Sequence, residues 1–328
     1  MAELSLERVQ AAARRLDGVA HRTPLVTSSE LNSRCGGRVL VKAEMLQRAG
    51  SFKFRGAYNR LCQLSPAQRA KGVVAYSSGN HGAAVALAAS VLGVPALIVV
   101  PETVSQAKLS AIEGYGGEVC RYNPANEHRE HVATRLAEQR SMTLVPPFDD
   151  YDVMAGQGTL GLEIAEAADG SLDQVLVPVG GGGLAAGVAT AITSLTGARV
   201  VGVEPAGAND TQQSIRAGHL VSIASAETVA DGLRSTRPGE LTFPINQALL
   251  SDVVTVEDAV IIEAMRFCFS RLKLAVEPSG AVALAAVLAG AVPTAGKTTA
   301  VVATGGNIHP ADFTALVQPA PPGIPATL

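Results

Sequence analysis

The sequence predicts an α/β fold built of mostly parallel sheets that are covered by helices. Short runs rich in β-branched residues alternate with helical patterns along the chain, which favours parallel strands joined by helices. The chain has 328 residues, of which 47% are hydrophobic and 17% charged. This composition allows large cores, and the length suits about two domains of ~150 residues. The expected strands are residues 39–42, 73–76, 96–100, 118–121, 174–179, 199–204, 253–256 and 299–303.

Two helices illustrate the pattern between the strands. The first is expected after Ser5, which can cap its N-terminus, and Gly18 ends it. Its apolar stripe consists of Leu6, Val9, Ala13 and Leu16. A second helix is expected over residues 81–92, where Gly93 stops it.

Bulk properties exclude several classes of function. The net charge is −3, so neither nucleic acid nor an anionic membrane is an expected partner. The longest apolar runs have the length of a strand, and the N-terminus lacks the layout of a signal peptide. The four cysteines are scattered and show no Cys-x-x-Cys spacing, which suits a reducing compartment. A cytoplasmic protein is therefore expected.

The first motif with chemical potential contains Lys53, in the run Ser51-Phe52-Lys53-Phe54-Arg55-Gly56-Ala57. A lysine amine whose pKa is lowered can form an imine with an aldehyde. Taken alone, Lys53 is better explained as a solvated lysine at the start of a helix. Two further motifs reverse this interpretation.

The second motif is the run of four glycines from Gly180 to Gly183, which follows an apolar strand and precedes an alanine-rich helical stretch. Backbone N–H groups without Cβ atoms can form an anion-binding nest at the start of a helix. A flexible linker is disfavoured because linkers rarely lie between such a strand and such a helix. The run is not Gly-x-x-x-x-Gly-Lys, and no acidic residue follows in the Rossmann manner. The motif therefore predicts a phosphate-binding loop.

The third motif is Ser77-Ser78-Gly79-Asn80-His81, where a strand ends and a helix begins. Hydroxyl groups and the unpaired N–H groups of a helix start can bind a carboxylate. A plain helix cap would need only one of these residues, so the full cluster indicates a binding site.

Together the three motifs resemble those of the fold type II, tryptophan-synthase-β-like enzymes that use pyridoxal 5'-phosphate (PLP). Within them, the sequence resembles the serine/threonine dehydratase and serine racemase family, from Thr23-Pro24-Leu25 to Thr304-Gly305-Gly306-Asn307. The resemblance implies two domains, each with a mostly parallel twisted sheet. Residues 1–71 and 150–328 would form a large domain that anchors PLP, and residues 72–149 a small domain that closes over the substrate. It also implies a homodimer.

The resemblance assigns a role to each motif residue. Lys53 becomes the Schiff-base lysine, and Ser78 faces the substrate Cα from the opposite side. Thr304 replaces the family's usual Ser beside the pyridine nitrogen, and such a neutral hydroxyl suits β-elimination. The implied PLP contacts are Phe52, Lys53, Asn80, Gly180, Gly181, Gly182, Gly183, Leu184 and Thr304. The implied contacts of the amino-acid substrate are Ser77, Ser78, Asn80, His81, Arg129 and Ser235.

A divalent-cation site is implied in the loop that follows the strand 199–204. Glu204, Ala208 and Asp210 match the cation site of serine racemase-like enzymes at identical spacing. Carboxylate and carbonyl oxygens are ligands that Mg²⁺, Mn²⁺ and Ca²⁺ accept. As a bare pattern, the same residues would be better explained as a solvated acidic loop.

The implied reaction is the PLP-dependent dehydration and deamination of a small β-hydroxy amino acid, of the L-serine or L-threonine type, to a 2-oxo acid and ammonia. Serine racemase and threo-3-hydroxyaspartate ammonia-lyase remain open as alternatives. Dehydration is favoured because Phe148 stands near a position where racemases tend to have Asn. Ala83 replaces a Gln that touches a nucleotide effector in racemases, which disfavours activation by ATP. Tyr115, Lys273 and Asn307 of the same effector site are retained, so nucleotide activation stays open. A contrasting hypothesis is a non-catalytic α/β module that binds a nucleotide through Gly180–Gly183 and gives Lys53 no role.

Overall fold

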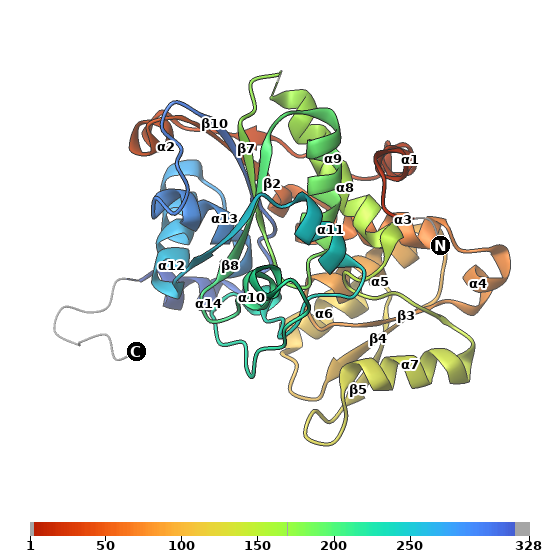
Figure 1. Ribbon diagram of the computed structural model, residues 1–328. Helices are drawn as coiled ribbons and strands as arrows, with labels where there is room; N and C mark the ends of the chain where they lie inside the picture. Colours follow the sequence, from red (N-terminus) through yellow and green to blue (C-terminus); the bar gives the residue numbers. More distant parts are fainter. Residues whose placement is uncertain (1–2, 169, 319–328) are drawn as a thin grey trace.

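The computed structural model describes residues 3–168 and 170–318 (Figure 1). Its described strands form two sheets, with the orders β1-β2-β10-β7-β8-β9 and β5-β4-β3-β6. Strands β1 and β2 pair antiparallel, and every other described pair of neighbouring strands is parallel. The predicted α/β fold with parallel sheets is confirmed.

The strands are β1 Leu25–Val26, β2 Arg38–Ala43, β3 Val73–Tyr76, β4 Ala96–Pro101, β5 Glu118–Tyr122, β6 Thr143–Leu144, β7 Gln174–Pro178, β8 Arg199–Pro205, β9 Asp252–Val256 and β10 Thr298–Ala303. The α-helices are α1 Leu6–Leu16, α2 Ser29–Cys35, α3 Lys53–Cys62, α4 Pro66–Lys71, α5 Asn80–Leu92, α6 Gln106–Gly114, α7 Arg129–Arg140, α8 Tyr151–Ala167, α9 Gly183–Leu195, α10 Asp210–Ala217, α11 Thr242–Leu249, α12 Asp258–Phe267, α13 Pro278–Leu288 and α14 Pro310–Val317. The eight predicted strands are confirmed to within one residue at either end, and the short strands β1 and β6 were not predicted.

The two predicted helices are present. The Ser5 side chain accepts a hydrogen bond from the Arg8 N–H and so caps α1. Ala12 is buried in this helix whereas Ala13 is only half-buried, so the predicted stripe was wrong at that position. Helix α5 ends at Gly93, which has the left-handed conformation (φ 66°) that favours glycine.

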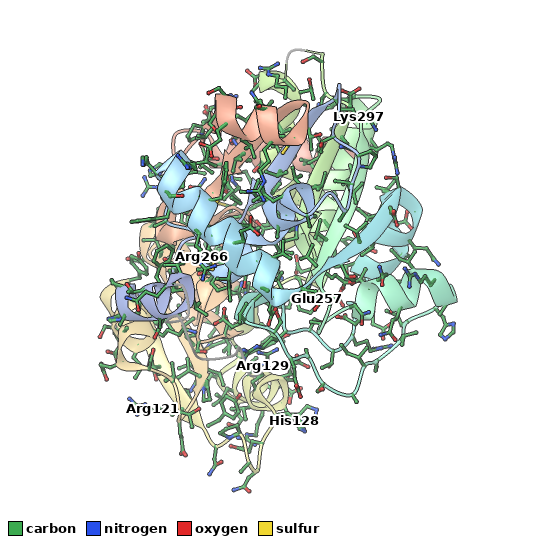
Figure 2. The ribbon with its side chains drawn as sticks, turned by 90° about the vertical axis from the view of Figure 1, so that its left-hand side faces the viewer. Arg121, His128, Arg129, Glu257, Arg266 and Lys297 are labelled. Atoms are coloured by element: carbon green, nitrogen blue, oxygen red, sulfur yellow. The ribbon has the colours of Figure 1, made fainter. Side chains whose placement is uncertain are left out.

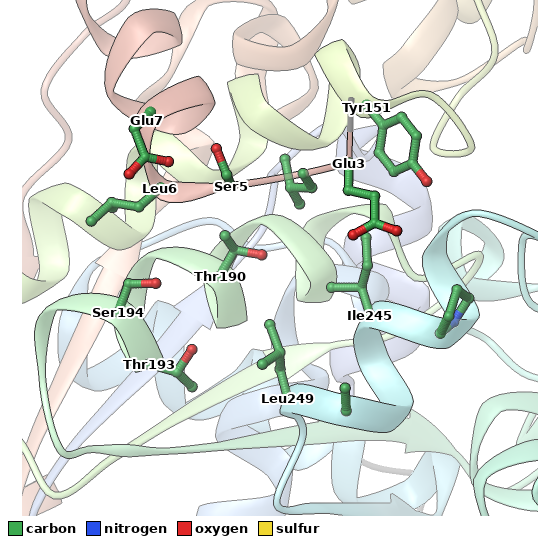
Figure 3. Close-up of a pocket in the computed structure, with 13 residues that line it drawn as sticks. Glu3, Ser5, Leu6, Glu7, Tyr151, Thr190, Thr193, Ser194, Ile245 and Leu249 are labelled. Atoms are coloured by element: carbon green, nitrogen blue, oxygen red, sulfur yellow. The ribbon is translucent and has the colours of Figure 1, made fainter. Parts of the chain in front are cut away.

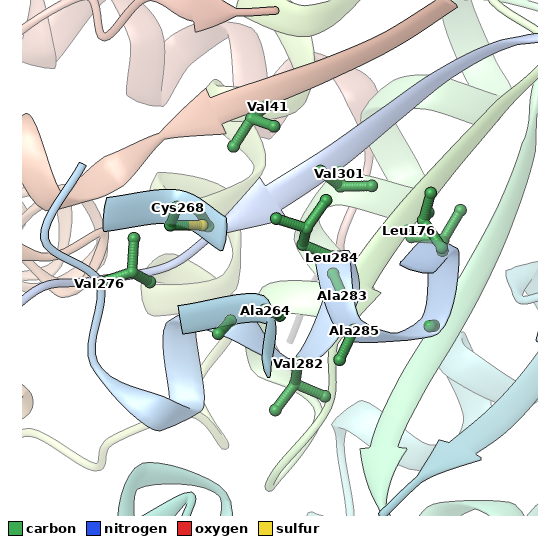
Figure 4. Packing of buried hydrophobic residues seen from close by; sticks show 14 of the residues in the cluster. Val41, Leu176, Ala264, Cys268, Val276, Val282, Ala283, Leu284, Ala285 and Val301 are labelled. Carbon is green, nitrogen blue, oxygen red and sulfur yellow. The ribbon is translucent and has the colours of Figure 1, made fainter. Parts of the chain in front are cut away.

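Helix α13 packs against the centre of the larger sheet. Figure 4 shows its residue Leu284 in one buried cluster with Val41 of β2, Val301 of β10 and Leu176 of β7. The burial of these side chains fixes the positions of three adjacent parallel strands.

The carboxyl ends of these strands define one edge of the larger sheet. Lys53 follows β2, Thr304 follows β10 and the glycine run follows β7. Ligands of open α/β sheets bind outside the carboxyl ends of the strands. The parallel arrangement therefore brings the predicted motifs to a common edge.

The smaller sheet is built from one continuous stretch of chain, because its four strands all lie between Val73 and Leu144. The domain boundary at residues 72–149 remains a prediction. Among the described residues, no helix combines the length and the apolar character that a membrane span requires.

Candidate active site

A cavity of 1130 Å³ opens where the edges of the two sheets meet. Both sheets contribute to its wall through the segments that follow β2, β3, β7 and β10. The structure brings all of the predicted cofactor and substrate residues to this one cavity. These are Phe52, Lys53, Ser77, Ser78, Asn80, His81, Arg129, Gly180, Gly181, Gly182, Gly183, Leu184, Ser235 and Thr304.

Lys53 is the first residue of α3, and its side chain forms part of the cavity wall. The Nζ atom donates a hydrogen bond of 2.7 Å to the Pro147 carbonyl and lies 5.2 Å from the centre of the Phe52 ring. Burial lowers the pKa of the Lys53 amine to about 8. A much larger fraction of this amine is therefore neutral near pH 7 than for an exposed lysine, as a nucleophile or base requires.

Buried ion pairs fix the helix that carries Lys53. The Arg55 guanidinium donates to both oxygens of Glu44 at 2.8 Å and to the Glu163 carboxylate at 2.6 and 3.0 Å. Arg55 and Glu44 are fully buried, so removal of either partner would leave an unpaired buried charge. The arginine of the Lys53 motif thus has a structural role.

The glycine run forms a loop and then the first turn of α9. Gly182 caps this helix with φ of 93°, a conformation that disfavours any residue with a Cβ atom. The Phe148 ring lies directly against Gly181, where a Cβ atom would collide with it. Within the described chain, no loop or cap hydrogen bond uses the N–H groups of Gly181 and Gly182. These donors border the cavity and fit a phosphate group.

Asn80 opens helix α5 and has its side-chain amide held on both sides. Its Nδ2 atom donates to Glu277 at 2.6 Å, and its Oδ1 atom accepts from Asn307 at 2.7 Å. Burial raises the pKa of the Glu277 carboxyl to about 8. Glu277 lines the cavity but was not singled out from the sequence. The only available signal was a Glu-Pro-Ser-Gly run at the start of α13, where Glu277 occupies the N-cap position.

The two serines and the histidine of the same motif differ in orientation. Ser77 accepts a hydrogen bond from the Gly79 N–H, and Ser78 is half-buried on the cavity wall. The buried His81 ring has a pKa lowered to about 3, first by burial and then by the Lys53 charge. Its Nε2 atom lies 2.9 Å from the Val145 carbonyl, so the neutral ring donates there. Only the backbone N–H of His81 is left to bind a substrate carboxylate.

Three further predicted residues lie around the cavity. The Thr304 hydroxyl is buried and makes one long hydrogen bond of 3.4 Å to the Ser279 carbonyl. The Ser235 hydroxyl donates to the Arg237 carbonyl at 2.7 Å. Figure 2 shows Arg129 at the start of α7, and its guanidinium lies 6.0 Å from the centre of the Tyr76 ring. Arg129 is exposed and forms no ion pair with any described residue.

The predicted cation loop lies between β8 and α10, and none of Glu204, Ala208 and Asp210 lines the cavity. Both Glu204 oxygens accept backbone hydrogen bonds, from Thr211 at 2.9 Å and from Gln212 at 2.8 Å. Both Asp210 oxygens are buried and have no hydrogen-bond partner among the described groups. Burial raises the pKa of Glu204 to about 8 and that of Asp210 to about 7. Two buried carboxyl groups, one of them unpartnered, fit a bound cation.

Comparison with known proteins decides the family. Residues 16–305 match the family described as pyridoxal-phosphate dependent enzyme. The chain belongs to this family. PLP is therefore the cofactor of this enzyme, which disfavours the non-catalytic nucleotide-binding module.

Relatives with named activities cover most of this PLP enzyme. L-threo-3-hydroxyaspartate ammonia-lyase of Saccharomyces cerevisiae is 42% identical over 94% of each chain. Maize serine racemase superposes with a TM-score of 0.92 at 37% identity, over 96% of this chain and 97% of that chain. The threonine deaminase of T.th. superposes with a TM-score of 0.88 at 44% identity, over 93% and 99% of the two chains. The fold is thus that of the fold type II PLP enzymes.

Proposed function

We propose that this PLP enzyme is an ammonia-lyase, which converts a small β-hydroxy amino acid into a 2-oxo acid and ammonia. The observation that carries the proposal is the position of the half-buried Lys53 amine in the cavity wall, hydrogen-bonded to the Pro147 carbonyl, and the lowered pKa of this amine agrees with it. Lys53 borders one cavity with the N–H groups of the glycine loop and the start of α5. The activities of these relatives support the same reaction type.

The residues of the cavity divide the chemical tasks. Bound PLP supplies an electron sink for the electron pair left on the substrate Cα. Lys53 would hold PLP covalently, and its amine would take the Cα proton once the substrate amine has replaced it. The phosphate would lie on the N–H groups of Gly180–Gly183, with Phe52, Asn80, Leu184 and Thr304 around the ring. The β-hydroxyl would take up a proton and leave as water. The released enamine would then tautomerise to an imine, which adds water and loses ammonia to give the 2-oxo acid.

Helix α5 would bind the substrate. Its first N–H groups, at Asn80 and His81, have no acceptor within the helix and can hold the α-carboxylate together with Ser77. Ser78 would face the Cα from the side opposite Lys53. A proton delivered by Ser78 would invert the Cα, so racemisation is the second candidate activity.

Arg129 favours a substrate with a second carboxylate, such as threo-3-hydroxyaspartate. Its guanidinium lies on the cavity wall and has no described ion-pair partner. Arg129→Gln should raise the KM for L-threo-3-hydroxyaspartate by about tenfold and leave that for L-serine unchanged, because only the former loses a charged contact. Arg121→Gln, at an exposed position of β5, is the matched control. An equal change in KM for both substrates would remove Arg129 from the specificity site.

The proposal is tested by assaying 2-oxo acid release from L-serine, D-serine, L-threonine and both hydroxyaspartate isomers. Lys53→Ala should lower turnover by at least about 10²–10⁴-fold and abolish the visible absorption of lysine-bound PLP. The exposed Lys71→Ala should retain both. Full activity of Lys53→Ala without an added amine would contradict the proposal.

Two accessory features belong to the same proposal. Glu204, the Ala208 carbonyl and Asp210 would hold Mg²⁺, Mn²⁺ or Ca²⁺, supported by the unpartnered Asp210 oxygens. The enzyme is also expected to form a homodimer, which light scattering would detect as twice the mass of the chain.

A further inference from the structure

Helix α11 donates two side-chain hydrogen bonds to the glycine loop, from residues that do not line the cavity. The Thr242 hydroxyl donates to the Gly181 carbonyl at 2.7 Å, and the Asn246 Nδ2 atom donates to the Gly182 carbonyl at 3.1 Å. Thr242 and Asn246 lie one turn apart on α11, and both are buried. Neither residue was singled out from the sequence.

The direction of these carbonyl groups determines the direction of the N–H groups. In a trans peptide the carbonyl oxygen and the next N–H point to opposite sides, and the described chain contains no cis peptide. When the carbonyls of Gly181 and Gly182 turn toward α11, the N–H groups of Gly182 and Gly183 turn away from it. The contact is close, because a Cβ atom on Gly182 would lie 2.5 Å from Asn246 Nδ2 and 2.8 Å from Thr242 Oγ1.

Asp149 fixes the end of the helix from which Thr242 acts. Its Oδ1 atom accepts from the N–H groups of Leu241 at 2.9 Å and Thr242 at 3.2 Å, and its Oδ2 atom accepts from that of Glu240 at 3.1 Å. Asp149 directly follows Phe148, whose ring covers Gly181. The segment Phe148-Asp149 therefore contacts both the glycine loop and the start of α11.

We propose that Thr242 and Asn246 are positioning residues that orient the phosphate-binding N–H groups of the glycine loop, and that Asp149 holds their helix in place. This inference rests on the proposed role of Gly180–Gly183 as the phosphate site. It predicts that these side chains affect the binding of the phosphate group rather than that of the pyridine ring.

Helix α9 offers a matched control. The buried Thr190 hydroxyl donates to the Ala186 carbonyl at 2.8 Å, a bond of the same kind as that of Thr242. This carbonyl belongs to the helix and not to the loop. Figure 3 shows Thr190 beside a separate surface pocket, opposite Ile245 and Leu249 of α11.

The experiment compares PLP with pyridoxal, which lacks the phosphate. The full-length wild type, Thr242→Val, Asn246→Leu and Thr190→Val are freed of cofactor and titrated with each compound. Each α11 variant should raise the dissociation constant for PLP by about threefold to tenfold, the usual effect of one lost hydrogen bond. The constant for pyridoxal should stay unchanged, and Thr242→Ser should restore PLP binding. Thr190→Val should change neither constant.

The outcomes distinguish the positioning role of Thr242 and Asn246 from the phosphate-binding role of the glycine loop. If Thr242→Val and Asn246→Leu weaken PLP and pyridoxal equally, or weaken neither, the positioning role is overturned. If one of them fails to fold, the other decides in the same way, because each removes a different bond to the loop. If the wild type binds pyridoxal as tightly as PLP, the phosphate role of the glycine loop is wrong instead. The ³¹P chemical shift of bound PLP should also move in the α11 variants and not in Thr190→Val.

Discussion

The Lys53 amine is enclosed by uncharged groups, and this surrounding controls its reactivity. Its hydrogen bond goes to the neutral Pro147 carbonyl, and the nearby His81 ring is neutral as well. No described carboxylate counteracts the effect of burial, so the pKa of Lys53 falls to about 8. The free amine is thus available at pH values where an ordinary lysine is protonated.

This pKa gives a pH dependence for cofactor attachment. Only the neutral amine attacks the PLP aldehyde, so the rate of covalent attachment should rise about tenfold per pH unit below pH 8 and level off above it. Stopped-flow absorption after mixing cofactor-free enzyme with PLP measures this rate. A rate that still rises about tenfold per unit between pH ~9 and ~10 would show an ordinary lysine.

Ser78→Ala separates elimination from racemisation. Inversion needs a proton donor on the face opposite Lys53, whereas elimination from the L-enantiomer needs only Lys53 and a departing hydroxyl. The variant should therefore lower racemisation by ~10²-fold or more and largely preserve dehydration of the L-substrate. Chiral chromatography and 2-oxo acid release measure the two reactions.

Dehydration of D-substrates provides the control for Ser78→Ala. The Cα proton of a D-substrate points toward Ser78, so its removal should fall in parallel with racemisation. Equal losses on L- and D-substrates would mean that Ser78 only positions the carboxylate.

Motif residues could be predicted at this scale because their chemistry is local to the sequence. Lys53 and the glycine run fall in recognisable segments, and the structure places both on one cavity. Glu277 and Asn246 escaped prediction because their partners, Asn80 and Gly182, are distant in sequence. The same distance hid the turn of the His81 ring toward Val145.

At the scale of elements, the loop between β8 and α10 shows two different uses of carboxylates. Glu204 binds the first N–H groups of α10, which stabilises the helix start. Asp210 has no such partner among the described groups, and burial disfavours its charge. Below about pH 7, the folded chain without a cation therefore holds both carboxyl groups mainly protonated.

Stability should therefore depend on pH and on cation together. Folded pKa values of about 8 for Glu204 and about 7 for Asp210 exceed the usual 4.5 and 3.8. The protonated carboxyl groups therefore contribute a stability to the folded state that is complete below pH ~4 and is lost as pH rises through 7 and 8. With EDTA, the melting temperature should fall by several degrees between pH ~6 and ~8. Mg²⁺, Mn²⁺ or Ca²⁺ should reverse the fall, in proportion to ln(1 + [L]/Kd).

Asp210→Asn tests the assignment of this loop. The neutral amide should remove the response to cation and the part of the pH-dependent fall that Asp210 causes, while the part due to Glu204 remains. Asp252→Asn, at an exposed position of β9, should change neither. Differential scanning calorimetry measures both. If chelator does not change the melting temperature anywhere in this pH range, the assignment of a cation site to this loop is wrong.

The long elements were predictable because each carries a periodic or β-branched signal of sufficient length. Strands β1 and β6 have two residues each, too few to show alternation. Their positions follow from tertiary pairing, with Lys42 and Val41 of β2 for β1 and with β3 for β6. Such contacts cannot be read from the local sequence.

At the scale of the whole molecule, bound PLP should stabilise the fold because it contacts segments that are distant in sequence. Its predicted contacts are residues 52–53, 80, 180–184 and 304. These residues follow strands of both sheets, so the cofactor would contact both. Ligand that binds only the folded state adds about 2.7 kcal/mol at a concentration of about 100 Kd. The melting temperature should thus rise with PLP concentration, as thermal unfolding would measure. An unchanged melting temperature would contradict a cofactor that joins these segments.

The strand order of the larger sheet bears on how the protein folds as it leaves the ribosome. Among the described strands, β2 pairs in parallel only with β10, which also pairs with β7. Residues 38–43 must therefore wait for residues 298–303 to be translated, whereas the smaller sheet is complete at residue 144. Long-range pairing of this kind is slow, and early segments fold first during synthesis. We therefore expect the nascent chain to complete its smaller sheet first, whereas β2 gains its parallel partner only after residue 303 has been made.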